Sequence, residues 1–145
     1  MKLDTLVTGG TLIDPVDGTA LPLNVGINAG KIAYIGDGKP ESKQSLEAGG
    51  MYVSPGFVDT HMHDEELDDH DTIQHALLRQ GVTSAIAGNC GSGPLRETYE
   101  PKRRKPWLKL AYQTGHTALR RAVGINDVYR PATADETVRM RKLLA

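Results

Sequence analysis

The fold is indicated most clearly by residues 54–63, which read SPGFVDTHMH. This segment begins as an apolar run and becomes polar at its end. Residues 71–80 carry apolar side chains at helical spacing, and Gly81 is placed to end that helix. A second apolar, partly β-branched run, VTSAIA, follows at 82–87. Strand, helix and strand in this order, with nearly continuous apolar strands, predict a parallel α/β unit.

The residues before this unit predict a small β module. Sixteen glycines are present and they cluster in the first half of the chain, which favours tight turns. The turn sequence Asn28-Ala29-Gly30 between two apolar runs is a hairpin signal. We expect a small, helix-free β module over residues 1–53 and the α/β part over residues 54–145. The short strands of the module are expected at 5–8, 11–13, 24–27 and 31–35.

The last third of the chain gives further local signals. Residues 107–112 predict a third strand. The basic run 102–105, KRRK, lies in a loop, and we interpret it as solvated surface rather than a binding patch. Thr133 and Glu136 form a capping box that opens a helix. The sequence reaches Ala145 without a helix-ending signal, so we expect an incomplete protein.

Composition and charge exclude several classes of function. The formal net charge is −1, which does not favour binding to nucleic acid. The single cysteine permits no intramolecular disulfide and fits a reducing compartment. No apolar run has the length of a signal peptide core or a membrane span. The sequence predicts a soluble, cytoplasmic protein with no membrane partner.

His61 and His63 stand at the end of the predicted strand, separated by one residue. Strand side chains alternate, so both imidazoles leave the same face, with Cβ atoms roughly 6–7 Å apart. That spacing suits two nitrogens about 2.0–2.1 Å from one ion. The carboxyl ends of parallel barrel strands are also where active sites are built. The alternative is a pair of surface histidines beside the acidic residues 64–66.

Cys90 follows the second strand, in the sequence Gly88-Asn89-Cys90-Gly91. A thiolate at a strand end, with glycines that allow close backbone approach, is suited to bind a metal at about 2.3 Å. The alternative is a small buried apolar side chain, which is the usual role of a free cysteine. The neighbouring strand that ends in His-x-His favours the ligand.

At these residues the sequence resembles the amidohydrolase superfamily, in its N-terminal part. Within it, the GNCG sequence resembles the D-aminoacylases, which are N-acyl-D-amino-acid deacylases, and residues 114–120 and 130–133 are also similar to that family. The matching stretches are DTLVTGGTLID at 4–14, VSPGFVDTHMH at 53–63 and QGVTSAIAGNCG at 80–91.

The resemblance implies a fold and a chemistry. The fold is α/β: a small β-sandwich followed by the first βα units of an incomplete TIM-like barrel. The activity is hydrolysis of the amide bond of small N-acyl-D-amino acids, with one or two zinc ions that polarise the carbonyl and acidify water. His61 and His63 would form part of one metal position and Cys90 part of an adjacent one. His116 would contribute to substrate binding.

This sequence departs from the family in two respects. The histidines of later strands and the general-base Asp are absent, so we expect that Asp beyond residue 145 and no catalytic residue within this chain. The segment between Gly91 and His116 is also short for the family. A piece of a barrel leaves strand edges unpaired, so we expect self-association.

Two other functions remain open. One is a cyclic-amide hydrolase of the dihydroorotase or hydantoinase kind, which shares the His-x-His but would not be expected to contain GNCG. The other is a non-catalytic fragment or binding module. For the 145-residue chain alone we expect weak zinc binding and no hydrolysis.

Overall fold

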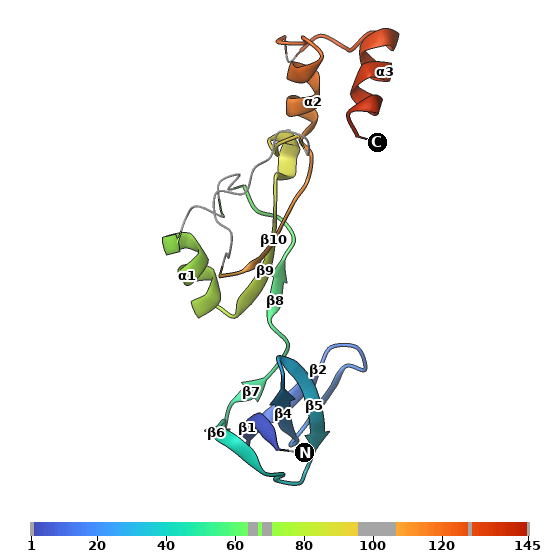
Figure 1. Cartoon of the computed structure of the whole chain (residues 1–145). Helices are drawn as coiled ribbons and strands as arrows, with labels where there is room; N and C mark the ends of the chain where they lie inside the picture. The colour runs from blue at the N-terminus through green and yellow to red at the C-terminus, as the bar shows by residue number, and fades with distance from the viewer. Residues whose placement is uncertain (1, 64–66, 68–70, 96–106, 128, 145) are drawn as a thin grey trace. The chain divides into compact units, whose positions relative to one another are not determined.

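A computed structural model describes residues 2–63, 67, 71–95, 107–127 and 129–144 (Figure 1). The chain divides into two compact units, Met1–Pro55 and Gly56–Ala145. None of the helices described is long and apolar enough to cross a membrane. The acidic residues 64–66 and the basic run 102–105, both noted in the sequence, lie outside the described residues.

The N-terminal unit contains two β-sheets and, within its described residues, no helix. The four-stranded sheet has the order β5-β4-β1-β6, with β4 antiparallel to both neighbours and β6 parallel to β1. The three-stranded sheet has the order β3-β2-β7. The strands are β1 (Leu3–Thr8), β2 (Thr11–Asp14), β3 (Thr19–Leu21), β4 (Asn24–Asn28), β5 (Lys31–Gly36), β6 (Ser42–Glu47) and β7 (Tyr52–Val53).

The hairpin between β4 and β5 confirms the predicted turn. Asn28 pairs with Lys31, and the two loop residues between them, Ala29 and Gly30, have φ values of 49° and 73°. Positive φ at both positions is what a two-residue type I′ turn requires, and alanine is unusual there. The Ala29 N–H donates to Asp4 at 2.7 Å. Lys43, at 2.6 Å from the same carboxylate, and the Ala29 amide lower the pKa of Asp4.

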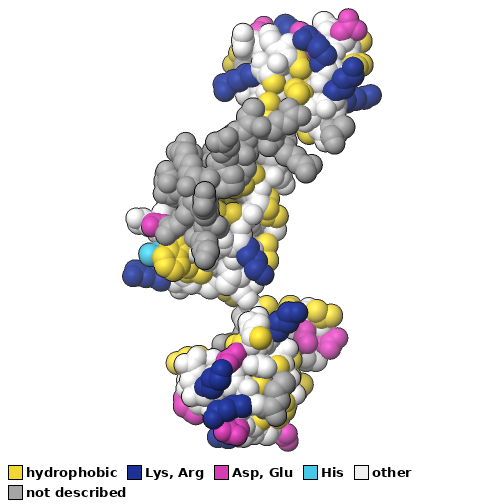
Figure 2. Space-filling model, in the orientation of Figure 1, with side chains coloured by type: hydrophobic (Ala, Val, Ile, Leu, Met, Phe, Trp, Pro, Cys, Tyr) yellow, Lys and Arg dark blue, Asp and Glu magenta, His cyan; other side chains and the backbone are white. Residues whose placement is uncertain are grey.

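The surface of the N-terminal unit mixes charges of both signs. On the face shown in Figure 2, acidic and basic side chains lie next to each other over this unit. Apolar side chains of both sheets line an open groove of about 310 Å³, among them Val7, Ile13, Val25 and Ile35.

The second unit begins with the predicted strand, helix and strand. The strands β8 (Phe57–Asp59), β9 (Val82–Ala87) and β10 (Lys109–Tyr112) form a parallel sheet in the order β10-β9-β8. Helix α1 (Asp71–Arg79) joins β8 to β9 and packs against β9 (Figure 1). Gly81 follows the helix with φ 82°, as a helix terminator requires.

A small apolar core lies between α1 and the sheet. It consists of Leu67, Leu77, Ala85 and Leu108. The side chain of Gln74 is fully buried beside it and makes two hydrogen bonds, since its amide donates to the Leu67 carbonyl at 2.7 Å and its oxygen accepts from the Trp107 N–H at 2.8 Å. Gln74 therefore links helix α1 by hydrogen bonds to Leu67, which precedes the helix, and to Trp107, which precedes β10.

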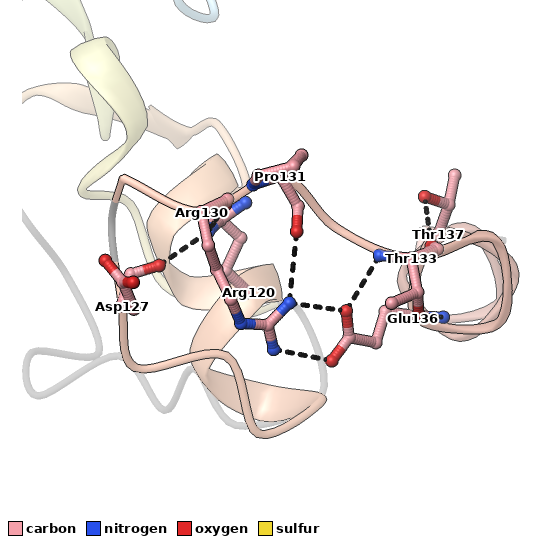
Figure 3. A network of polar contacts seen from close by, with 7 residues as sticks. All are labelled: Arg120, Asp127, Arg130, Pro131, Thr133, Glu136 and Thr137. Atoms are coloured by element: carbon pink, nitrogen blue, oxygen red, sulfur yellow. Dashed lines mark hydrogen bonds and ion pairs between the residues drawn. The ribbon is translucent and has the colours of Figure 1, made fainter.

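The unit ends in a pair of packed helices, α2 (His116–Ala122) and α3 (Ala134–Lys142). Their shared core is Leu119, Val123, Ile125 and Met140. The capping box of α3 is confirmed: the Glu136 N–H donates to Thr133 Oγ1 at 3.2 Å, and the Thr133 N–H donates to the Glu136 carboxylate at 2.8 Å (Figure 3). Helix α2 was not predicted.

The same carboxylate is held by an arginine. Arg130 donates two hydrogen bonds to Glu136, at 2.9 and 2.7 Å (Figure 3). This contact, together with the Thr133 amide, lowers the pKa of Glu136 to about 2, and Glu136 in turn raises the pKa of Arg130. Arg120 donates to the carbonyls of Asp127 and Arg130, both at 2.7 Å, so the connection between the helices is fixed by side chains.

Candidate metal centre

Three side chains that the sequence singles out meet in the second unit. The Nε2 atoms of His61 and His63 lie 3.2 Å apart, and Cys90 Sγ lies 3.5 Å from the first and 3.7 Å from the second. All three residues are exposed to solvent. No carboxylate joins this cluster among the residues that the structure describes.

These separations agree with one shared ion. Two nitrogens at 2.0–2.1 Å from a tetrahedral ion lie about 3.3 Å apart, and a nitrogen and a sulfur at 2.3 Å lie about 3.6 Å apart. The three distances between donors, 3.2, 3.5 and 3.7 Å, bracket those values. Two imidazoles and a thiolate are also a donor set that zinc accepts. The three donor atoms are therefore close enough to share a single ion, whereas the resemblance implied that Cys90 belongs to a position adjacent to that of the histidines.

The two histidines do not lie on a strand, contrary to the prediction. Strand β8 ends at Asp59, and the Asp59 carboxylate accepts a hydrogen bond from the His61 N–H at 3.1 Å. The chain still runs beside β9, because the Met62 N–H donates to the Ile86 carbonyl at 3.2 Å. Met62 packs against the core of the unit, and the two imidazoles lie together in the solvent-exposed cluster.

Cys90 lies in a short 3₁₀ turn, η2 (Asn89–Gly91), directly after β9. Its φ of 55° is in the left-handed region, which is uncommon for a residue other than glycine. The neighbours Gly88 and Gly91 also have positive φ values, 82° and 89°. The alternative interpretation of Cys90 as a buried apolar side chain is wrong, since the residue is exposed.

Close backbone contacts explain the glycines around the cysteine. A Cβ atom at Gly88 would lie 2.5 Å from the Gln113 carbonyl oxygen, and one at Gly93 only 1.9 Å from it. A Cβ at Gly115 would lie 2.3 Å from the carbonyl oxygen of Gly91. The turn that carries Cys90 is thus packed directly against the segment that follows β10, with no room for side chains.

His116 is placed apart from the three donors. It is the first residue of α2, is exposed, and is not a member of the donor cluster. Helix α2 contacts the turn that carries Cys90, so His116 begins a helix in the same part of the unit.

One residue of the site was not assigned a role from the sequence. The side chain of Asn89 is 7% exposed, and its amide nitrogen lies within hydrogen-bonding distance of three carbonyl oxygens. The only sequence signal was its position inside GNCG.

Comparison with known proteins gives relatives but no family model, since none matches the chain. An N-acyl-D-glutamate deacylase of Alcaligenes xylosoxydans xylosoxydans is 41% identical over 91 residues, 62% of this chain and 19% of that protein. A D-aminoacylase of the same organism is 30% identical over 167 positions, 97% of this chain and 34% of that protein. That alignment is longer than the 145 residues of this chain, so the relative has residues without a counterpart here.

A solved structure of an N-acyl-D-amino-acid deacylase has a similar fold. A crystal structure of N-acyl-D-glutamate deacylase from Bordetella bronchiseptica, complexed with zinc and a phosphonate inhibitor, superposes with a TM-score of 0.83 at 28% identity, over 99% of this chain and 36% of the other. This agrees with the predicted α/β fold, a small β module followed by the start of a TIM-like barrel. The chain spans about a third or less of the length of these relatives.

Proposed function

From the premise that the chain is related to the D-aminoacylases and corresponds to the N-terminal part of an amidohydrolase, we propose that it takes part in metal-dependent hydrolysis of the amide bond of N-acyl-D-amino acids. The observation that carries the proposal is the convergence of His61, His63 and Cys90 at the separations of a single metal ion. The small-molecule substrate class is supported by the names of the relatives, which act on N-acyl-D-glutamate and other acylated D-amino acids.

In this proposal His61, His63 and Cys90 are the ligands that the chain supplies, and zinc is the ion. When bound, zinc makes a carbonyl more electrophilic and water more acidic. The two imidazoles and the thiolate fix the position of the ion, and the exposed side of the cluster is where a substrate would enter. The relatives include a D-aminoacylase described as having a binuclear metal centre. The three donors here account for one ion, and we propose that a second ion would need ligands other than these.

The proposal assigns no proton acceptor to this chain. The donor cluster has no carboxylate among the described residues. The substrate-binding role of His116 remains part of the proposal, as a residue at the start of a helix that contacts the Cys90 turn.

A cyclic-amide hydrolase is the second candidate, and one observation favours it. An allantoinase of Salmonella choleraesuis (strain SC-B67) is 34% identical over 110 residues, 70% of this chain and 24% of that protein. The presence of GNCG, which the hydantoinase kind is not expected to contain, favours the deacylase.

The decisive experiment is an assay of the complete gene product with zinc. We expect it to release free D-amino acid from N-acetyl-D-amino acids, to leave the L forms intact, and to lose this activity in H61A, H63A and C90A. Opening of hydantoin or allantoin rings without deacylation would instead support the second candidate. Retention of deacylation in all three variants would contradict the proposed ligands.

A further inference from the structure

Asn89 lies between the two segments that carry the donor side chains. Its amide nitrogen is 2.9 Å from the Ile86 carbonyl oxygen, at the end of β9. The same nitrogen is 3.4 Å from the carbonyl oxygens of Thr60 and Met62, on the other segment. A carboxamide has two N–H donors, and here they are shared among three main-chain oxygens, of which the Ile86 oxygen also accepts from the Met62 N–H.

The two weaker contacts surround a metal-site residue. Thr60 and Met62 are the residues immediately before and after His61, and Met62 immediately precedes His63. Holding these two carbonyls fixes the Thr60–His61 and Met62–His63 peptide planes, which immediately precede the two histidines, and with them the directions in which the imidazoles leave the chain. The carboxamide thereby acts on the histidines through the backbone.

The main chain of Asn89 is held by Ser92, within the turn that carries Cys90. Its carbonyl oxygen accepts hydrogen bonds from the Ser92 hydroxyl at 2.9 Å and from the Ser92 N–H at 3.4 Å. Cys90 lies inside this turn, with its φ of 55°. One residue is therefore fixed both to the cysteine turn and to the histidine segment.

We propose that Asn89 is a positioning residue that sets the distance between the Cys90 thiolate and the two imidazoles. The inference rests on the proposed metal site, because it concerns how that site is held in shape. Residues that contact metal ligands without binding the metal themselves orient those ligands, and their loss typically weakens metal binding about 10- to 100-fold. Aspartate in its place would direct a carboxylate at three carbonyl oxygens, and alanine would remove the side-chain donor from all three.

A matched control exists in the N-terminal unit. Asn24 is also 7% exposed, and its amide nitrogen donates to the carbonyls of Asp37 and Gly38, at 3.2 and 2.9 Å. Its side-chain oxygen also accepts from the Gly9 N–H at 3.2 Å. N24A thus removes a comparable set of buried side-chain to main-chain hydrogen bonds without touching the donors.

The test is a cobalt titration of the 145-residue chain and of N89A, N89D and N24A. The thiolate-to-cobalt charge-transfer absorption reports Cys90 ligation directly, and thermal melts of the metal-free proteins report stability separately. We expect the dissociation constant to rise about 10- to 100-fold in N89A and N89D, and to stay unchanged in N24A. An unchanged dissociation constant in N89A would overturn the inference. Absence of the thiolate band in the unmodified chain would instead overturn the proposed metal site.

A measurement on the unmodified chain covers the case in which the Asn89 variants do not fold. The side-chain amide protons of Asn89 should exchange with solvent more slowly than those of Asn126, which is exposed. Zinc should shift the Asn89 amide resonances in NMR spectra and leave those of Asn24 in place. Exchange as fast as in Asn126, or no response to zinc, would contradict the inference.

Discussion

The sulfur of Cys90 lies 3.5 Å from Nε2 of His61, although the two residues are 29 positions apart in the sequence. Parallel pairing of β8 with β9 produces this proximity, since Asp59 is in register with Ala85 and both strands end at the same edge of the sheet. The proximity of the candidate ligands is therefore a direct product of strand topology.

Removing the thiolate should weaken metal binding more than any change outside the ligand set. We expect C90S to lose the thiolate-to-cobalt absorption and to bind cobalt more than about 100-fold less tightly, beyond the range typical of outer partners. Two imidazoles would remain. Titration of C90S beside the unmodified chain checks this, and equal affinities would mean that Cys90 is not a ligand.

The isolated 145-residue chain should bind zinc weakly and catalyse no hydrolysis. Three exposed donors leave the ion open to solvent, and no carboxylate lies in the cluster among the described residues. Zinc competition with a chromogenic chelator gives the affinity, and incubation with N-acetyl-D-amino acids tests turnover. Measurable turnover by the purified chain would contradict this prediction.

Gly93 should not tolerate alanine. A Cβ atom there would lie 1.9 Å from the Gln113 carbonyl oxygen, which cannot move away without shifting the backbone that follows β10. We expect G93A to lower the free energy of unfolding by about 1–3 kcal/mol and to weaken cobalt binding. The control is G49A, because a Cβ at Gly49 would meet nothing within 4 Å. Urea unfolding of both variants measures the difference, and similar curves would contradict the packing described for this turn.

Acid should weaken the α2–α3 pair through Glu136. The folded state lowers the pKa of this carboxyl from an ordinary 4.5 to about 2, so its contribution to stability is fully present above pH 4.5 and is lost as the pH falls toward 2. E136Q keeps a side chain that can complete the capping box but removes the charge. Circular dichroism melts between pH 7 and 2 should show a steeper loss for the unmodified chain than for E136Q. Parallel curves would show that the Arg130 contact contributes no pH dependence.

The isolated chain should self-associate through the parallel sheet. Strands β8 and β10 each pair on one side only within the described residues, and Val58 on β8 is 57% exposed. Sedimentation velocity should show mass that rises with concentration, and V58K should reduce it because a lysine opposes edge pairing. V16K, at an exposed valine of the other unit, is the control. A monodisperse monomer with a cooperative melt would contradict the prediction.

Much of the fold could be predicted from local patterns. The apolar runs at 57–59 and 82–87, the hairpin at Ala29 and the capping box at Thr133 each carry their signal within a few residues. Helix α2 gave no such signal. Its N-cap is Gly115, without a side-chain hydrogen bond. A glycine is required there because a Cβ atom would lie 2.3 Å from the Gly91 carbonyl oxygen, and not because of the helix.

Features that depend on residues far apart in the chain were harder to predict from the sequence. Strand β6, SKQSLE, is mostly polar and exposed, and it is held by parallel pairing with β1, more than thirty residues earlier in the sequence. Strand β8 ends at Asp59, whose carboxylate accepts a hydrogen bond from the His61 N–H, and the apolar pattern of the sequence does not indicate this contact. The proximity of His61, His63 and Cys90 could be predicted, because residue type and strand order suffice to bring them together, and their role as metal ligands stays a prediction. The contacts of Asn89 could not be predicted, because its partners are backbone carbonyl oxygens, which every residue has and which no sequence pattern distinguishes.

The exposed fourth side of the donor cluster has a practical consequence for the choice of ion. An enclosed site selects a metal by size and geometry, whereas an open pair of imidazoles with a thiolate follows the general order of affinities, in which copper exceeds zinc. Preparations of this chain would then take up the ion that the medium supplies, including nickel from a chelating column. Metal content is thus a variable to be set before any comparison of variants.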